Sequence, residues 1–324
     1  MDPTVRARFT PDHLSDLAQR YGTAGESLQA LDGFESFVFD DRGHDRVIRV
    51  GHSGRRPADL VQAEVDWLAY LAAHDVPVAQ ALPSGAGHLI EELDDGAGGR
   101  FVAVAFQRAR GAQSQVRDRT PAFARHYGAV LGRLHRVSVE YEPRLRRPSW
   151  DDPAMLDVRR HIPSDQPLVR EAWDRTLARV RDGAGSPSQF GLIHQDSHGG
   201  NFFVDDGRIT LFDFDDCCYG PFAMEIGIVI FYAAVLLDEP EDFAAWFVPN
   251  LLAGYCAEFD TSLDPEAVQD CIALREIDTY GIVWRDGEQD SDQPWTGALR
   301  QRRERIERGT PLIQIRPEWI SAGG

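Results

Sequence analysis

Hydrophobic patterning divides the chain into a strand-rich first third and a mainly helical remainder. Residues 36–41 (SFVFDD) and 45–50 (DRVIRV) are rich in β-branched and aromatic side chains and flank the polar turn RGH, which predicts a β-hairpin. After Pro57, apolar residues recur at the spacing of one helix face, which predicts a single helix. Two more strands are predicted at HLIEEL (88–93) and RFVAVAFQ (100–107).

From residue 108 onward the pattern becomes helical. The segment RARGAQSQ interrupts the strand pattern and predicts a connector. A helix is then predicted by the apolar stripe of Phe123, Tyr127, Val130, Leu131, Leu134 and Val137. Further helices are predicted at about 166–182, 222–237, 241–258, 265–284 and 295–308. We therefore expect an α+β fold, with a small antiparallel sheet and one helix in residues 1–107 and a larger helical lobe in residues 108–324.

One stretch, LIHQDSHGGNFFVDDGRITLFDFDD (192–216), brings strands into the helical part. The apolar residues before His194 indicate a strand that ends in a loop, and NFFV and ITLF around the turn DDG predict a hairpin. A hairpin brings its two ends together, so Asn201 and Asp213 are expected to lie near each other. Hard oxygen ligands of this kind suit a magnesium ion completed by phosphate oxygens. Asp196, in the preceding loop, could accept a proton from an attacking hydroxyl.

Charge narrows the choice of partners. The 34 basic residues are all arginines, and against 52 acids they leave a net charge of −18. This acidity argues against nucleic acids and anionic membranes as partners and permits a cationic small molecule. A solvated acidic surface without a binding role is the favoured explanation of the overall charge.

Targeting signals and cysteines indicate the compartment. No apolar run approaches the roughly 18 residues of a membrane-spanning helix. The N-terminal sequence MDPTVRARFTPDHL lacks the apolar segment of a signal peptide. The four cysteines have no CxxC metal spacing, so we expect reduced thiols in a cytoplasmic protein. The sequence gives no indication of the oligomeric state.

The motifs HQDSHGGN and LFDFDD resemble the catalytic and metal-binding segments of the aminoglycoside phosphotransferase and choline kinase-like family. Other segments are similar to family elements in the same order: VIRV, QAEVDWLAYLAAHDVPV, FVAVAFQRARG and GAVLGRLHRVS. The resemblance spans about residues 25 to 285. It implies a protein kinase-like two-lobed fold and transfer of the γ-phosphate of ATP or GTP, with Mg²⁺, to a hydroxyl acceptor.

The same resemblance assigns roles within the catalytic segment. It makes Asp196 the catalytic aspartate and makes Asn201 and Asp213 the magnesium ligands. His194 and Glu225 are expected to support the catalytic loop. Asp215 is either a ligand of a second metal ion or a structural residue.

In the first lobe, the resemblance implies that Arg49 contacts phosphate and pairs with Glu64. Glu64 lies on the apolar stripe of its helix, where a carboxylate is costly unless it is paired, and Arg49 is a plausible partner in the adjacent strand. The resemblance also places Ser36, Gln107 and Ala109 in the nucleotide site. The expected glycine-rich loop is sparse, because LDGFESF contains one glycine.

Other functions remain open at this stage. His194, Asp196 and His198 alternate and could bind a metal in a hydrolase, and a nucleotide-binding pseudokinase would keep the same motifs without catalysis. Within the kinase interpretation, the acceptor is a small alcohol or a protein serine or threonine. Glu276 and Asp278 favour an amine-bearing acceptor such as an aminoglycoside or amino alcohol, whereas Arg275 could bind a carboxylate.

Overall fold

The computed structural model describes residues 1–33, 35–114, 119–153, 155–183, 189–289 and 298–321. Contacts within the chain divide it into two compact units. The first unit comprises residues 1–111, 141–147 and 210–215, and the second comprises residues 112–140, 148–209 and 216–324. A short piece of the predicted metal-binding motif, ending at Asp215, therefore belongs to the same unit as the N-terminal sheet.

The first unit is built on an antiparallel sheet with β3 and β6 at its centre. The strand order is β1-β2-β3-β6-β4, and β5 also pairs with β6. The hairpin predicted around RGH is confirmed, with Val38 opposite Arg49. The strands are β1 (Gln29–Leu31), β2 (Phe37–Asp41), β3 (Arg46–His52), β4 (Ala81–Leu82), β5 (Glu91–Asp94) and β6 (Arg100–Gln107).

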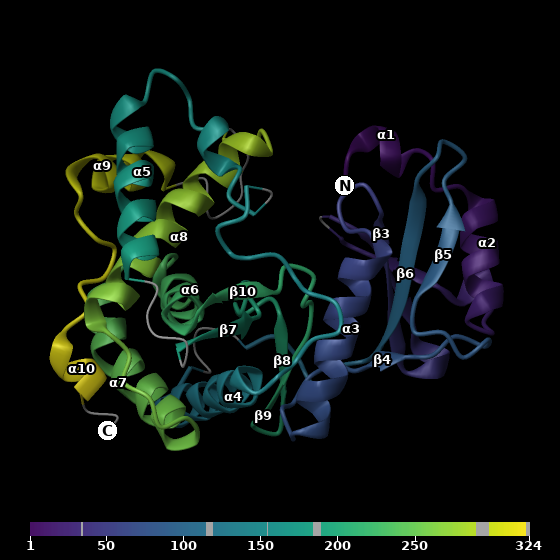
Figure 1. The fold of residues 1–324 in the computed structure, drawn as a ribbon, viewed down its shortest axis with the longest axis horizontal. Helices are drawn as coiled ribbons and strands as arrows, with labels where there is room; N and C mark the ends of the chain where they lie inside the picture. The colour runs from purple at the N-terminus through teal and green to yellow at the C-terminus, as the bar shows by residue number, and fades with distance from the viewer. Residues whose placement is uncertain (34, 115–118, 154, 184–188, 290–297, 322–324) are drawn as a thin grey trace. The chain divides into compact units, whose positions relative to one another are not determined.

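Helices cover both faces of this sheet, as Figure 1 shows for β6. Alternate side chains of a strand point to opposite faces, so Phe101 packs with Leu17 of α2, whereas Val104 packs with Val65 of α3. The predicted helix after Pro57 is α3. The sequence analysis missed α2, because its sequence PDHLSDLAQR is mostly polar and buries only Leu17 and Ala18 fully. The helices are α1 (Pro3–Arg6), α2 (Pro11–Arg20) and α3 (Ala58–Ala73).

The second unit is mainly helical, as predicted. Proline occupies the first turn of several of its helices, where its missing N–H costs nothing, and Thr120 caps α4 by accepting from the Phe123 amide at 3.1 Å. The predicted start of the last long helix, at residue 295, lies outside the described residues. The helices are α4 (Pro121–Val139), α5 (Pro167–Asp182), α6 (Phe222–Ala234), α7 (Pro240–Glu258), α8 (Pro265–Arg285), α9 (Leu299–Arg308) and α10 (Pro317–Ser321).

Glycines allow α4 and α7 to pack with their backbones in contact. A Cβ atom at Gly128 would lie 1.8 Å from the carbonyl oxygen of Leu251, and one at Gly254 would lie 1.8 Å from that of Arg125. No side chain fits at either position. This close packing fixes the position of α4 against α7.

Two small sheets complete the fold. The predicted strand before His194 is β7 (Phe190–Ile193), and the predicted hairpin with the turn DDG is β8 (Phe202–Asp205) and β9 (Arg208–Leu211). The partner of β7 is β10 (Cys218–Pro221), which the sequence analysis missed because CYGP contains glycine and proline. Among the described residues, no helix is long and apolar enough to cross a membrane.

Candidate active site

The catalytic loop begins where β7 ends and runs from His194 to Asn201. Gln195 has a φ of 71°, in the left-handed region, which turns the chain sharply after the strand. Two short hydrogen bonds keep the loop compact: the His198 amide donates to the Asp196 carbonyl at 2.8 Å, and the Asn201 amide donates to the His198 carbonyl at 2.9 Å. Asp196 and Asn201 are thereby brought together, as their spacing predicts.

The Asp196 carboxylate has a donor on each oxygen. Its Oδ2 accepts from the Asn201 side-chain amide at 2.9 Å and lies 3.3 Å from His198 Nε2, and its Oδ1 accepts from Arg275 at 2.6 Å. Burial raises the pKa of Asp196, but the His198 hydrogen bond and the Arg275 charge outweigh this and hold the pKa well below its usual value. Asp196 is therefore an ionised acceptor, 25% exposed.

Arg275 links the catalytic loop to α8. Besides Asp196 it donates to Asp278 at 3.1 Å, and its guanidinium carbon lies 5.1 Å from the centre of the Tyr232 ring in α6. A narrow pocket next to these groups is lined by Gln195, Arg275 and Asp278 and by apolar side chains: Trp150, Leu156, Trp173, Met224, Ile228, Cys271 and Leu274. The sequence analysis expected Arg275 at the acceptor and gave no sign of its contact with Asp196, because 79 residues separate them.

Glu276 lies apart from this group, because adjacent residues of a helix point in directions about 100° apart. Its carboxylate is buried and accepts from Arg305 of α9 at 2.5 Å. Burial raises the pKa of Glu276, and Arg305 opposes that shift. Of the two acids predicted to attract an amine, Asp278 is the one beside the catalytic loop.

Buried polar residues support the backbone of the loop. Glu225 Oε2 accepts from the amides of His194 at 2.5 Å and Gln195 at 3.3 Å, and His135 Nε2 lies 4.0 Å from the same oxygen. The hydroxyl of Tyr127 in α4 donates to the Ser197 carbonyl at 2.9 Å. The contacts of Glu225 suit its expected supporting role, whereas Tyr127 gave no sequence signal beyond its place on an apolar stripe.

In the first unit, Arg49 and Glu64 form the ion pair that their positions predict. The Arg49 guanidinium donates to Glu64 Oε2 at 2.6 Å, and the Glu64 side chain is fully buried. Burial lowers the pKa of Arg49, but the charges of Glu64 and Asp215 outweigh it and raise that pKa above its ordinary value. Arg49 also approaches Asp213 Oδ1 at 3.4 Å. That this pair contacts nucleotide phosphate stays a prediction.

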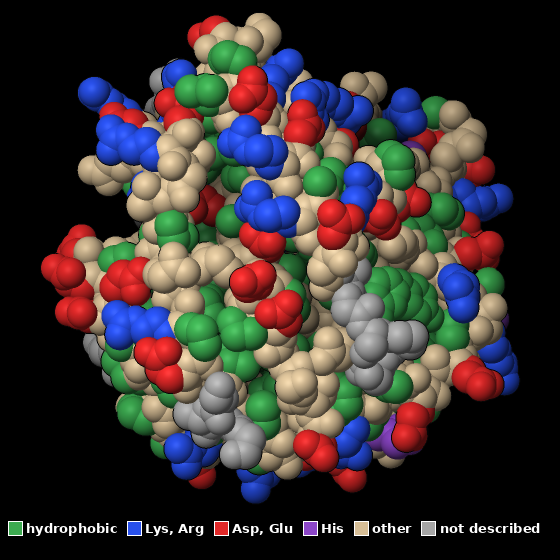
Figure 2. Space-filling model, turned by 60° about the vertical axis from the view of Figure 1, so that its left-hand side comes forward, with side chains coloured by type: hydrophobic (Ala, Val, Ile, Leu, Met, Phe, Trp, Pro, Cys, Tyr) green, Lys and Arg blue, Asp and Glu red, His purple; other side chains and the backbone are tan. Residues whose placement is uncertain are grey.

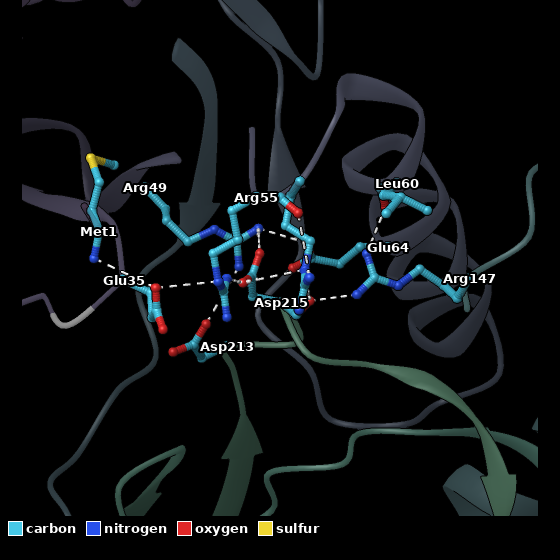
Figure 3. Close-up of polar contacts among 10 residues, drawn as sticks. Met1, Glu35, Arg49, Arg55, Leu60, Glu64, Arg147, Asp213 and Asp215 are labelled. Atoms are coloured by element: carbon cyan, nitrogen blue, oxygen red, sulfur yellow. Dashed lines mark hydrogen bonds and ion pairs between the residues drawn. The ribbon is translucent and has the colours of Figure 1, made fainter. Parts of the chain in front are cut away.

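Asp215 is surrounded by arginines (Figure 3). Its carboxylate accepts from Arg55 and lies 3.8 Å from nitrogens of both Arg49 and Arg56, and its carbonyl accepts from Arg147. Burial raises the pKa of Asp215, but the charges of these arginines hold it well below the usual value. The arrangement supports the structural alternative for Asp215, while its role as a second metal ligand stays untested.

Asn201 and Asp213 carry oxygens that suit a hard cation. The Asn201 side chain donates through its nitrogen to the Asp196 carbonyl and carboxylate, which leaves its oxygen available for a metal. Asp213 has a φ of 62°, and its side chain is 53% exposed. Carboxylate and amide oxygens fit Mg²⁺. Asn201 belongs to the second unit and Asp213 to the first, so their sharing of one ion stays a prediction.

The remaining nucleotide-binding candidates lie in the loop before β2 and at the end of β6. A Cβ atom at Gly33 would lie 2.3 Å from the Ser36 carbonyl oxygen, so this tight loop requires glycine there. Gln107 ends β6 and donates its amide to the Gln80 carbonyl at 2.8 Å, and Ala109 follows in the connector. Their contacts with a nucleotide stay predictions.

Comparison with known proteins supports the resemblance. The "phosphotransferase enzyme family" matches residues 26–270. The chain is 30% identical over 317 residues to amicoumacin kinase of Bacillus subtilis (strain 168), covering 92% of each protein. A structure of an amicoumacin kinase in complex with AMP-PNP, Ca²⁺ and Ami has a TM-score of 0.90 at 27% identity over 98% of both chains. A microcompartment-associated aminopropanol kinase has the same fold, with a TM-score of 0.72 at 20% identity over 95% of this chain and 99% of that one.

Proposed function

The chain belongs to the phosphotransferase enzyme family and is an ATP-dependent kinase, and we propose that it phosphorylates a hydroxyl of a small, amine-bearing acceptor. The family and the protein kinase-like α+β fold predicted from the sequence are confirmed, and the family displaces the hydrolase alternative built on His194, Asp196 and His198. The observation that carries the proposal is the Asp196 carboxylate, ionised, partly exposed and positioned by Asn201 and Arg275.

Asp196 is the residue that receives the acceptor. Phosphoryl transfer needs a nucleophile held in line with the phosphate, and a carboxylate that accepts a hydrogen bond from the hydroxyl supplies this orientation. Its low pKa makes it a weak base, which suits orientation of the hydroxyl and acceptance of its proton late in the transfer. Glu225 and Tyr127 keep the loop in place through its backbone.

Asn201 and Asp213 are the residues that would hold Mg²⁺. When bound, the ion would neutralise charge on the phosphates of the nucleotide. Arg49, fixed by Glu64, would contact the same phosphates, because a guanidinium binds phosphate oxygens in pairs. Ser36, Gln107 and Ala109 would contact the rest of the nucleotide.

The acceptor site would lie beside Asp196, along α8. Asp278 is 16% exposed. Burial raises the pKa of Asp278, although the charge of Arg275 opposes this shift. A cationic amine beside Asp278 would favour the charged form of the carboxylate. The Bacillus subtilis relative is an amicoumacin kinase, so amicoumacin is the first acceptor to test. The acidic excess alone gives weaker support, because arginines and acids are interspersed on the face shown in Figure 2.

A screen of acceptors with magnesium and ATP tests the proposal. ADP release is measured with amicoumacin, aminoglycosides, amino alcohols, neutral sugars and a generic protein substrate. We expect turnover with an amine-bearing compound, and no turnover by the Asp213→Ala variant with its fold intact. A neutral sugar or a protein serine as the best acceptor would exclude the amine, and a fully active Asp213→Ala variant would exclude the metal assignment.

The role of Asp278 is tested by Asp278→Asn. We expect the acceptor KM to rise about 10-fold and the nucleotide KM to stay constant, because loss of one charged hydrogen bond costs about 1.5–3 kcal/mol and exposure reduces that value. Asp270→Asn, on the same helix but paired with Arg179 at 2.8 Å, is the matched control. Equal effects of the two substitutions on acceptor KM would contradict a specific contact.

A further inference from the structure

Asp215 contacts four arginines, whose positive charge exceeds what one carboxylate can neutralise. Arg49, Arg55 and Arg56 approach its side chain, and Arg147 donates to its carbonyl. Asp213, Glu35 and Glu64 supply the other negative charges of this cluster. The N-terminal ammonium of Met1 also lies 3.5 Å from Glu35 Oε2, so these cations and carboxylates form one connected cluster. Any change that engages one of its carboxylates elsewhere leaves more of its positive charge unpaired.

Arg55 differs from its neighbours in exposure and in its second partner. Its side chain is 31% exposed, against 10% for Arg49 and 12% for Arg56, so an anion from solvent can reach it. It donates to Asp215, and its Nε lies 3.3 Å from Glu35 Oε2 (Figure 3). Glu35 lies in the loop before β2, and Asp215 lies two residues after Asp213. Arg55 thus connects two segments that are expected to meet phosphate.

The carboxylate of Glu35 is unfavourable in a loop that is expected to bind phosphate. The segment LDGFESF has one glycine and the carboxylate of Glu35, and that carboxylate would repel a triphosphate. Arg55 and the N-terminal ammonium of Met1 offset the Glu35 charge in the structure. When a cation engages Asp213, which Arg49 approaches at 3.4 Å, the cluster gains positive charge that phosphate oxygens would neutralise.

We propose that Arg55 is a phosphate-binding residue of the nucleotide site, which contacts Glu35 and Asp215 in this structure and turns to the terminal phosphates of a bound triphosphate. The proposal rests on the proposed function, because it takes the bound nucleotide as its premise. It adds a second arginine beside Arg49, on the turn between β3 and α3, and gives the first arginine of GRRP a function. Glu35 then competes with phosphate for Arg55.

Titration calorimetry tests the role of Arg55. It measures the binding of ATP, ADP and AMP with Mg²⁺ in the absence of an acceptor. Arg55→Met should weaken ATP binding about 10–100-fold, since a hydrogen bond to a charged group contributes about 1.5–3 kcal/mol. Its affinity for AMP should stay unchanged, and Arg55→Lys should bind ATP with intermediate affinity. Arg110→Met is the matched control, since Arg110 is 73% exposed in the same unit and pairs with Asp45 at 3.1 Å.

Glu35→Gln separates phosphate binding from a structural ion pair. Removing the competing carboxylate should tighten ATP binding several-fold, whereas a merely structural contact would leave the affinity unchanged or weaken it. Thermal unfolding of each variant identifies any loss of fold. Unchanged ATP affinity in both Arg55→Met and Glu35→Gln would overturn the assignment of Arg55. A wild-type protein that bound no adenine nucleotide would instead overturn the proposed function.

Discussion

Asp196 and Asp215 are both carboxylates with depressed pKa values, yet their surroundings differ in kind. Asp196 has one arginine, one asparagine amide and one histidine near it and is 25% exposed. Asp215 has three guanidinium groups at its carboxylate and a fourth at its carbonyl, and is 19% exposed. One environment leaves room for a further partner, and the other is filled by cations.

The difference shows that the groups around an aspartate determine its role. A carboxylate that must accept a substrate hydroxyl needs an open side, and one arginine beside it leaves that side free, whereas several cationic partners would have to be displaced first. A carboxylate between several arginines serves instead to gather and orient those arginines. We therefore expect substitution of Asp196 to act mainly on turnover and substitution of Asp215 mainly on stability.

The largest expected effect is that of Asp196→Asn on turnover. Loss of the hydrogen-bond acceptor for the nucleophile should lower kcat by about 10²–10⁴-fold, with little change in nucleotide affinity. The unfolding free energy should change by less than about 1 kcal/mol, because Arg275 keeps Asp278 as a partner. Steady-state kinetics, nucleotide titration and urea unfolding measure the three quantities. A variant with full turnover would remove Asp196 from the reaction.

Asp215→Asn should have the opposite profile. Its arginines would lose their common anion, so we expect a loss of about 1.5–3 kcal/mol in unfolding free energy, measured by urea titration. Asp174→Asn is the control, because Asp174 forms an exposed pair with Arg159 at 2.6 Å and exposed pairs contribute little. If Asp215→Asn were as stable as the wild type, the view of Asp215 as the anchor of the arginines would fail.

The smallest expected effect is the coupling between Arg49 and Glu64. Removing either partner leaves the other charged and buried, so Arg49→Met and Glu64→Gln should each lower kcat/KM for the nucleotide. The double variant should be less than additive by about 0.5–3 kcal/mol. Strict additivity in this cycle would mean that the 2.6 Å ion pair does not act as a unit.

Local sequence patterns predicted most elements because each depends on neighbours in the chain. The hairpins of β2–β3 and β8–β9 follow from turn residues between β-rich runs, and the long helices follow from apolar stripes with proline at their starts. The patterns gave no sign of the short strands β1 and β4, and they failed at α2 and β10, whose sequences are polar or contain glycine and proline. In those two elements, packing against the rest of the fold outweighs local preference.

The contact between Asp196 and Asn201 was likewise predictable, because they are five residues apart in one loop. The sequence by itself thus determined the kinase-like fold and the family, and it supplied the candidates for the reacting groups. Apart from the predicted pair of Arg49 and Glu64, only the tertiary structure decided which arginine meets which acid. Arg275 reaches Asp196 across 79 residues, and Arg147 reaches Asp215 across 68. Such contacts depend on how helices and loops pack, and in a chain whose basic residues are all arginines the residue type cannot distinguish one partner from another.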